Sequence, residues 1–264
     1  MEPKNVKLKK ILTPLGFMRK KPGTGRHFGS VYFRYYGNES VQAVRLVRQR
    51  TGETNLYASA FSIYDPELSK WLEDPAFTPV AYSAANFAGL RLGPLWYTPQ
   101  EKRKEIDPSC IFSFTDRSAG TVSYSYSPTA EEEMNCLQNF VIPRLNGINS
   151  QEKLLQLYHD LDMAEYGKEY LLRRERIYPA LACGKYDEVY KTIHSIIEQN
   201  KSAMIRKKEY MPETDYSAYC RKVEAKWTPL LEIKAMLDNN EEGTIQTFLS
   251  KAKDQNLLAW NALA

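Results

Sequence analysis

The sequence predicts an α+β fold, in which an antiparallel sheet is packed by helices and is followed by an all-α helical domain. Three observations support this prediction. Residues 31–64 alternate with a period of two in three strand-like runs joined by short connections. At Thr129 the period of the apolar residues changes to 3.6, which is typical of helices. From there to Ala264 no strand pattern occurs.

The first element is an amphipathic helix that should end near residue 15. Four apolar residues follow the i, i+3, i+4, i+7 spacing of one helical stripe: Leu8, Ile11, Leu12 and Leu15. Gly16 should end the helix, because glycine adopts the left-handed conformation of a C-cap without steric cost. We expect this helix to cover one face of the sheet.

Strand patterns occupy residues 31–36, 41–48 and 55–64, and Gly37-Asn38 suits a hairpin turn between the first two. Residues 65–108 are irregular and hold six prolines, with a weaker strand pattern within them at 87–96.

A second hairpin is predicted beyond this irregular segment. Residues 110–114 and 121–126 alternate cleanly around a turn at 116–120. Together these patterns indicate an antiparallel sheet of about five strands.

The remaining elements are helices. Thr129 and Glu132 form a capping box for a helix at 129–142, which should cover the sheet and end at Pro143. Another helix begins near Asn149. Further helical patterns lie at 167–182, 186–200, 216–238, 243–252 and 254–261. The pattern at 216–238 should be broken at Thr228-Pro229, where Thr suits the cap and Pro suits the first turn of a new helix. The chain should therefore divide into an α+β sheet domain at 1–147 and a helical domain at 148–264.

Composition excludes several classes of protein. The four cysteines are dispersed and only three histidines occur, which argues against a zinc site and a dense disulfide framework. No apolar run reaches the roughly 20 residues of a membrane span. We expect a soluble cytoplasmic protein without a metal or cofactor.

The motifs of common enzymes do not occur. The sequence has no G-x-G-x-x-G dinucleotide fingerprint, no G-x-x-x-x-G-K-[ST] phosphate loop and no G-x-S-x-G nucleophile elbow. The acidic run at 131–133 opens a predicted helix, where carboxylates offset the helix dipole. No catalytic residue is assigned.

Arginines near aromatic residues form the one pattern that suggests a binding site. The candidate binding residues are Arg34, Arg45, Arg91 and Tyr124. Such a surface could bind single-stranded nucleic acid through stacking and phosphate contacts. The net charge of +4 is low for a dedicated nucleic-acid-binding protein, and no RNP-type motif occurs. A solvated or ion-paired sheet face and a site for a protein or a small anion stay open.

Several short motifs, taken in order, resemble a bacterial family catalogued as domain of unknown function 4304. They read Leu12-x-Pro14-Leu15-Gly16-Phe17-x-Arg19-Lys20, Ile63-Tyr64-x-Pro66-Glu67-Leu68, Arg91-Leu92-Gly93-x-Leu95 and Val141-Ile142-Pro143-x-Leu145. The resemblance covers about residues 5–160. It implies helices against an antiparallel sheet and brings no established activity. The family usually carries tryptophans in the strand before its closing helix, where this chain has residues 121–126 without one.

The function expected from these observations is that of a non-enzymatic bacterial interaction protein whose partner is another protein. The sheet, or the concave side of the helical part, would meet that partner. A toxin-neutralising immunity-type protein is a narrower form of this class. The alternatives are a nucleic-acid-binding accessory protein and an enzyme with an unrecognised site. The sequence leaves the partner and the oligomeric state open.

Overall fold

A computed structural model describes most of the chain and confirms the predicted α+β class. The described residues are 3–20, 31–48, 54–73, 89–91, 114–116, 122–124, 131, 134–135, 137–166 and 174–263. Five antiparallel strands form the main sheet, in the order in which they follow along the chain. They are β1 (Met18–Lys20), β2 (Val31–Tyr36), β3 (Ser40–Arg48), β4 (Thr54–Ser62) and β5 (Gly89–Arg91).

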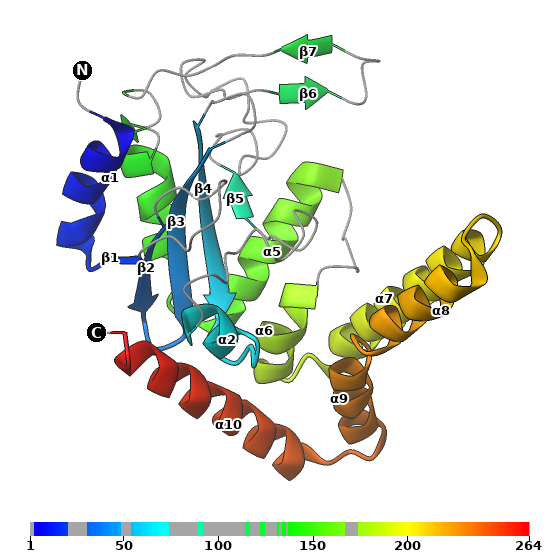
Figure 1. Ribbon diagram of the computed structural model, residues 1–264. Helices are drawn as coiled ribbons and strands as arrows, with labels where there is room; N and C mark the ends of the chain where they lie inside the picture. Colours follow the sequence, from blue (N-terminus) through cyan, green and yellow to red (C-terminus); the bar gives the residue numbers. More distant parts are fainter. Residues whose placement is uncertain are drawn as a thin grey trace.

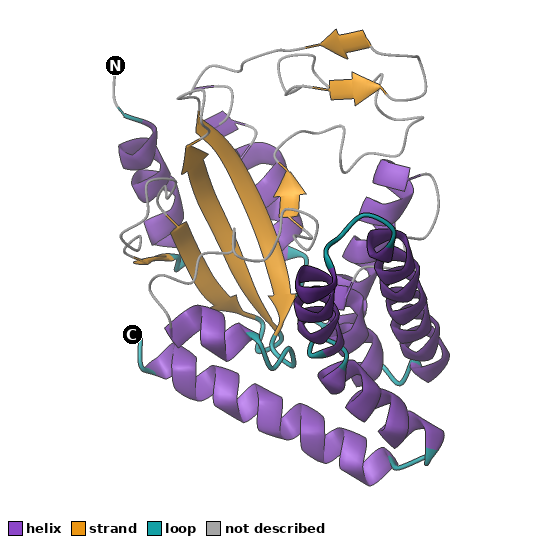
Figure 2. Ribbon diagram, turned by 45° about the vertical axis from the view of Figure 1, so that its right-hand side comes forward, coloured by secondary structure: helices purple, strands orange, loops and turns teal. Residues whose placement is uncertain are grey.

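Helices pack on both faces of this sheet (Figures 1 and 2). On one face, α1 (Lys4–Leu12) and α5 (Gln151–Tyr166) contribute Leu12 and Leu154 to a core that also contains Tyr32 and Val44 of the sheet. On the other face lie α2 (Leu68–Glu73) and the end of α10 (Glu242–Asn261), which pack against Phe33. Because neighbouring residues of a strand point to opposite faces, the alternation within β2 supplies both cores.

The first helix ends as the sequence predicts. After α1 a short 3-10 turn, η1 (Thr13–Leu15), leads to Gly16, whose φ of 81° is left-handed. Leu12 is fully buried.

The predicted second hairpin is present, as β6 (Phe114–Asp116) and β7 (Val122–Tyr124). It forms a separate two-stranded sheet and adds no strand to the main one (Figure 2). The main sheet instead contains β5, within the weaker pattern at 87–96, and β1, a three-residue strand that is too short to show an alternating pattern.

The helix expected at 129–142 continues past Pro143, so the expectation that proline ends it is wrong. The π-helix η5 (Leu137–Val141) leads directly into α4 (Ile142–Asn146). Proline has no N–H for the carbonyl four residues earlier, and a wider π turn accommodates that lost hydrogen bond. Pro143 is the second residue of α4.

The helical part contains η6 (Arg174–Arg176), α6 (Ile177–Ala182), α7 (Tyr186–Lys208), α8 (Glu213–Glu224), α9 (Thr228–Asp238) and α10. The two helices expected at 243–252 and 254–261 are one helix, α10. Within the described ranges no helix combines the length and the apolar character that a membrane span requires.

Hydrogen bonds connect the helical part to the sheet across the predicted boundary at residue 147. The Tyr158 hydroxyl of α5 donates to the carbonyl of Ala60 in β4 at 2.8 Å. The Asn256 side chain of α10 donates from Nδ2 to the carbonyls of Ile63 at 2.6 Å and Asp65 at 2.8 Å. Both α5 and α10 therefore contribute to the packing of the sheet, and the division into two domains stays a prediction.

Candidate functional site

Arg34, the first predicted binding residue, points into the protein. Arg34 is only 5% exposed to solvent. Nε and Nη2 donate to Oε1 of Gln42 at 3.1 and 2.9 Å, and Nη1 donates to the carbonyl of Leu15 at 2.9 Å. Nη2 also donates to Oδ1 of Asn146. These bonds connect β2 with β3, η1 and α4, so Arg34 holds the helices on the sheet.

The backbone register brings two of the other predicted residues into one row. Arg45 of β3 and Arg91 of β5 both pair with Tyr57 of β4, one on each side. Tyr124 lies in the separate sheet, where it pairs with Phe114. A binding role for Arg45, Arg91 and Tyr124 stays a prediction.

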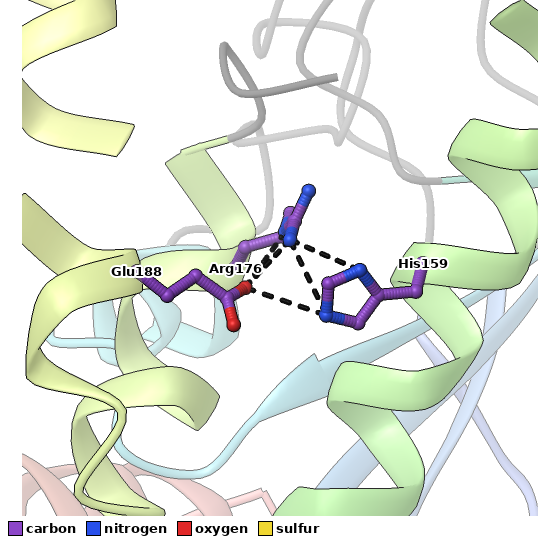
Figure 3. Close-up of polar contacts among 3 residues, drawn as sticks. All are labelled: His159, Arg176 and Glu188. Carbon is purple, nitrogen blue, oxygen red and sulfur yellow. Dashed lines mark hydrogen bonds and ion pairs between the residues drawn. The ribbon is translucent and has the colours of Figure 1, made fainter. Parts of the chain in front are cut away.

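A polar cluster around a buried arginine joins three helices of the chain (Figure 3). Arg176, at the end of η6, is fully buried. Its Nη2 and Nε donate to Oε1 of Glu188, in the first turn of α7, at 2.6 and 3.2 Å. Nη2 also lies 3.1 Å from Nδ1 and 3.3 Å from Nε2 of His159 on α5. The Nε2 atom of His159 is 3.5 Å from the same Glu188 oxygen.

Glu188 is a carboxylate partner of the buried Arg176. A buried guanidinium is strongly destabilising without a carboxylate partner, and Glu188 supplies that partner. Glu188 also lies at the start of a helix, where its negative charge suits the helix dipole. The cluster thus connects α5 and the start of α7 to Arg176, the residue that precedes α6.

The most exposed part of the described chain is a helical hairpin, which we call the arm. It consists of residues 198–222, from the second half of α7 to the end of α8. Figure 1 shows α7 and α8 projecting together away from the sheet and α10. All residues of the arm are described, and none of them is buried, whereas Ile197 and Val223 at its base are. The arm therefore adds no residue to a hydrophobic core.

Contacts between α7 and α8 hold the arm together. The Lys207 ammonium nitrogen lies 4.1 Å from the centroid of the Tyr219 ring. A cation over an aromatic ring at an exposed site contributes about 0.5–1 kcal/mol. This contact keeps the end of α7 next to α8.

The tip of the arm, residues 205–215, carries large apolar side chains in water. Ile205 is 67% exposed and Tyr210 is 70% exposed. Three basic residues, 206–208, lie between them. The tip also carries three acidic residues, Glu209, Glu213 and Asp215, so its formal charges balance.

The arm emerges from one of two helical hairpins with the same turn. Gly184, before α7, and Asn240, before α10, have left-handed φ values of 69° and 52°. Matching hydrogen bonds close the turns, from the Lys185 N–H to the Ala180 carbonyl and from the Glu241 N–H to the Met236 carbonyl. The pairs α6–α7 and α9–α10 are thus joined by turns of the same conformation. Helix α8 lies between the two pairs and belongs to neither.

The arm was not predicted as a candidate site from the sequence. The break expected at Thr228-Pro229 is present, because α9 begins at Thr228. The basic run 206–208, however, fits a solvated helix end. The available signal was the placement of Ile205 and Tyr210 on either side of that run.

Comparisons with protein-family models, with curated proteins and with solved structures returned no match. The resemblance to domain of unknown function 4304 therefore stays a prediction.

Proposed function

We propose that this chain is a non-enzymatic interaction protein and that the arm binds another protein. The observation that carries the proposal is a run of 25 residues, 198–222, without a buried side chain. Ordering a residue costs about 1–2 kcal/mol of backbone entropy, which burial normally offsets. The residues of this ordered hairpin are all exposed or only half-buried, so its exposed apolar side chains are available for a partner.

The exposed side chains at the tip are suited to a protein surface. Burial of apolar surface stabilises an interface by about 25 cal/mol per Å². Tyrosine is enriched among the residues that dominate protein–protein binding energy, and Tyr210 is 70% exposed. We therefore assign Ile205 and Tyr210 as the apolar centre of the binding surface.

The charge of the tip favours a protein over a nucleic acid. Binding to nucleic acid depends on an excess of Lys and Arg that neutralises phosphates. At the tip the basic run 206–208 is offset by Glu209, Glu213 and Asp215. A surface with both signs of charge fits a protein partner that also carries both.

The cytoplasm of a bacterium is the location we propose, following the family resemblance. The two described cysteines, Cys183 and Cys220, are free thiols, as is usual in reducing compartments. Burial raises the pKa of the Cys183 thiol to about 11, so this thiol stays protonated at neutral pH and is a weak nucleophile.

Photo-crosslinking in the native host tests the proposal. A photoreactive residue replaces Tyr210 in one variant and Leu258 of α10 in the control, because Leu258 is similarly exposed at 71%. We expect position 210 to give a defined adduct with a protein and position 258 to give none. The absence of an adduct at 210, or the same adducts at both positions, would contradict the proposal.

A further inference from the structure

We propose that the protein bound by the arm is a second copy of this chain, paired tip to tip across a two-fold axis. The inference rests on the proposed function and names its partner. The observations behind it are the arrangement of charges on the tip and the apolar side chains among them.

The charges of the tip are divided between its two helices. Arg206 and Lys208 lie at the end of α7, and Glu213 and Asp215 lie at the start of α8. All four are exposed, and none of them has an ion pair within the described part of the chain. Each sign of charge is therefore available to a partner.

This arrangement is self-complementary. In a two-fold dimer, if residue i of one copy meets residue j of the other, then j of the first also meets i of the second. The basic end of α7 can thus face the acidic start of α8 in the other copy, and the same contact occurs twice. A tip with one sign of charge would repel its copy instead.

Helix dipoles alone would favour acidic residues at the start of α8 and basic residues at the end of α7. They do not account for Ile205 and Tyr210, which are 67% and 70% exposed beside those charges. In the proposed dimer these two side chains lie between the two ion-pair contacts and become buried from solvent. The charges then determine the register, and the apolar side chains supply the affinity.

Charge exchange between two variants tests this dimer. One variant carries Arg206→Glu and Lys208→Glu, and the other carries Glu213→Lys and Asp215→Lys. Sedimentation velocity of the full chain gives the association state. The protein concentration is varied from about 1 to 500 µM, because interfaces under about 1,200 Å² are typically weak. We expect a reversible dimer for the wild type and monomers for each variant alone. An equimolar mixture of the two should form a dimer, because both contacts then become attractive again.

A matched control reverses two exposed charges at the other end of α8, with Arg221→Glu and Lys222→Glu. This variant should dimerise like the wild type, whereas Ile205→Ser with Tyr210→Ser should not. Thermal melts confirm that each variant is folded. A monomeric wild type at all concentrations, a mixture that stays monomeric, or an equal loss in the control would overturn the inference. A monomeric wild type that still gives a crosslinked protein at position 210 would overturn the dimer and leave the proposed function standing.

Discussion

Asp65 provides a test of how the helical part is attached to the sheet. It lies in the turn between β4 and α2, and its backbone carbonyl accepts the hydrogen bond from Asn256 of α10. Its Oδ1 accepts a hydrogen bond from the Glu67 N–H at 2.9 Å. Burial raises the pKa of this carboxyl to about 6. The substitution Asp65→Asn keeps the acceptor and the size of the side chain and removes the titration.

The magnitude follows from the difference in pKa between the folded and unfolded states. An unperturbed Asp has a pKa of about 3.9. The folded protein holds the proton more tightly than the unfolded chain, so the stabilisation from this group is fully present below about pH 4. It is lost as the pH rises through about 6. Two pKa units correspond to about 3 kcal/mol, and solvent screening of this partly exposed residue reduces the value to about 2–3 kcal/mol.

Urea unfolding of both proteins at about pH 4 and pH 7.5 measures this effect. Between the two conditions the unfolding free energy of the wild type should fall by about 2–3 kcal/mol relative to Asp65→Asn. The comparison with the variant cancels the titration of other groups. Parallel pH profiles would refute the reasoning. If the variant lost stability relative to the wild type at pH 7.5, attraction to Arg174 would outweigh burial.

Further substitutions test other parts of the structure by urea unfolding. Arg34→Ala should lower the unfolding free energy by about 3–5 kcal/mol because buried acceptors lose their donor, and a loss under about 1 kcal/mol would reopen a surface role. Arg176→Ala should cost a similar amount, since Glu188 is left without its buried partner, and adding Glu188→Gln should recover part of it. Gly184→Ala should cost about 1–2 kcal/mol and Gly184→Asn less, because Asn240 adopts the same left-handed conformation, and equal losses would argue against the matched turns.

Local patterns predicted the elements whose signals lie within a few residues of one another. The strands at 31–36 and 41–48, the second hairpin and the helix cap at Gly16 belong to this group. The length of α10 was not predictable in this way. The predicted division falls at residue 253, and Asn256, which is fully buried, lies within the second of the two predicted helices. Its partners, the carbonyls of Ile63 and Asp65, are distant in sequence.

The candidate site was harder to predict than the fold for a related reason. An arginine beside aromatic residues on a strand has the same local pattern whether it faces solvent or the interior. The acceptors that bring Arg34 inside come from Leu15, Gln42 and Asn146, on three separate elements. The exposure of Ile205 and Tyr210 likewise arises because α7 extends beyond the helices and strands that form the cores, and no local sequence pattern predicts that extension.

The central claim is that residues 198–222 serve binding and are not needed for folding. A variant in which a glycine–serine linker of about five residues joins Ile197 to Val223 tests it directly, since such a linker spans the 8–10 Å between packed helices. The measurement is its unfolding free energy in urea. We predict a value within about 1 kcal/mol of the wild type, because no residue of the arm is buried. A loss of more than about 3 kcal/mol would contradict the claim and make the arm part of the folded core.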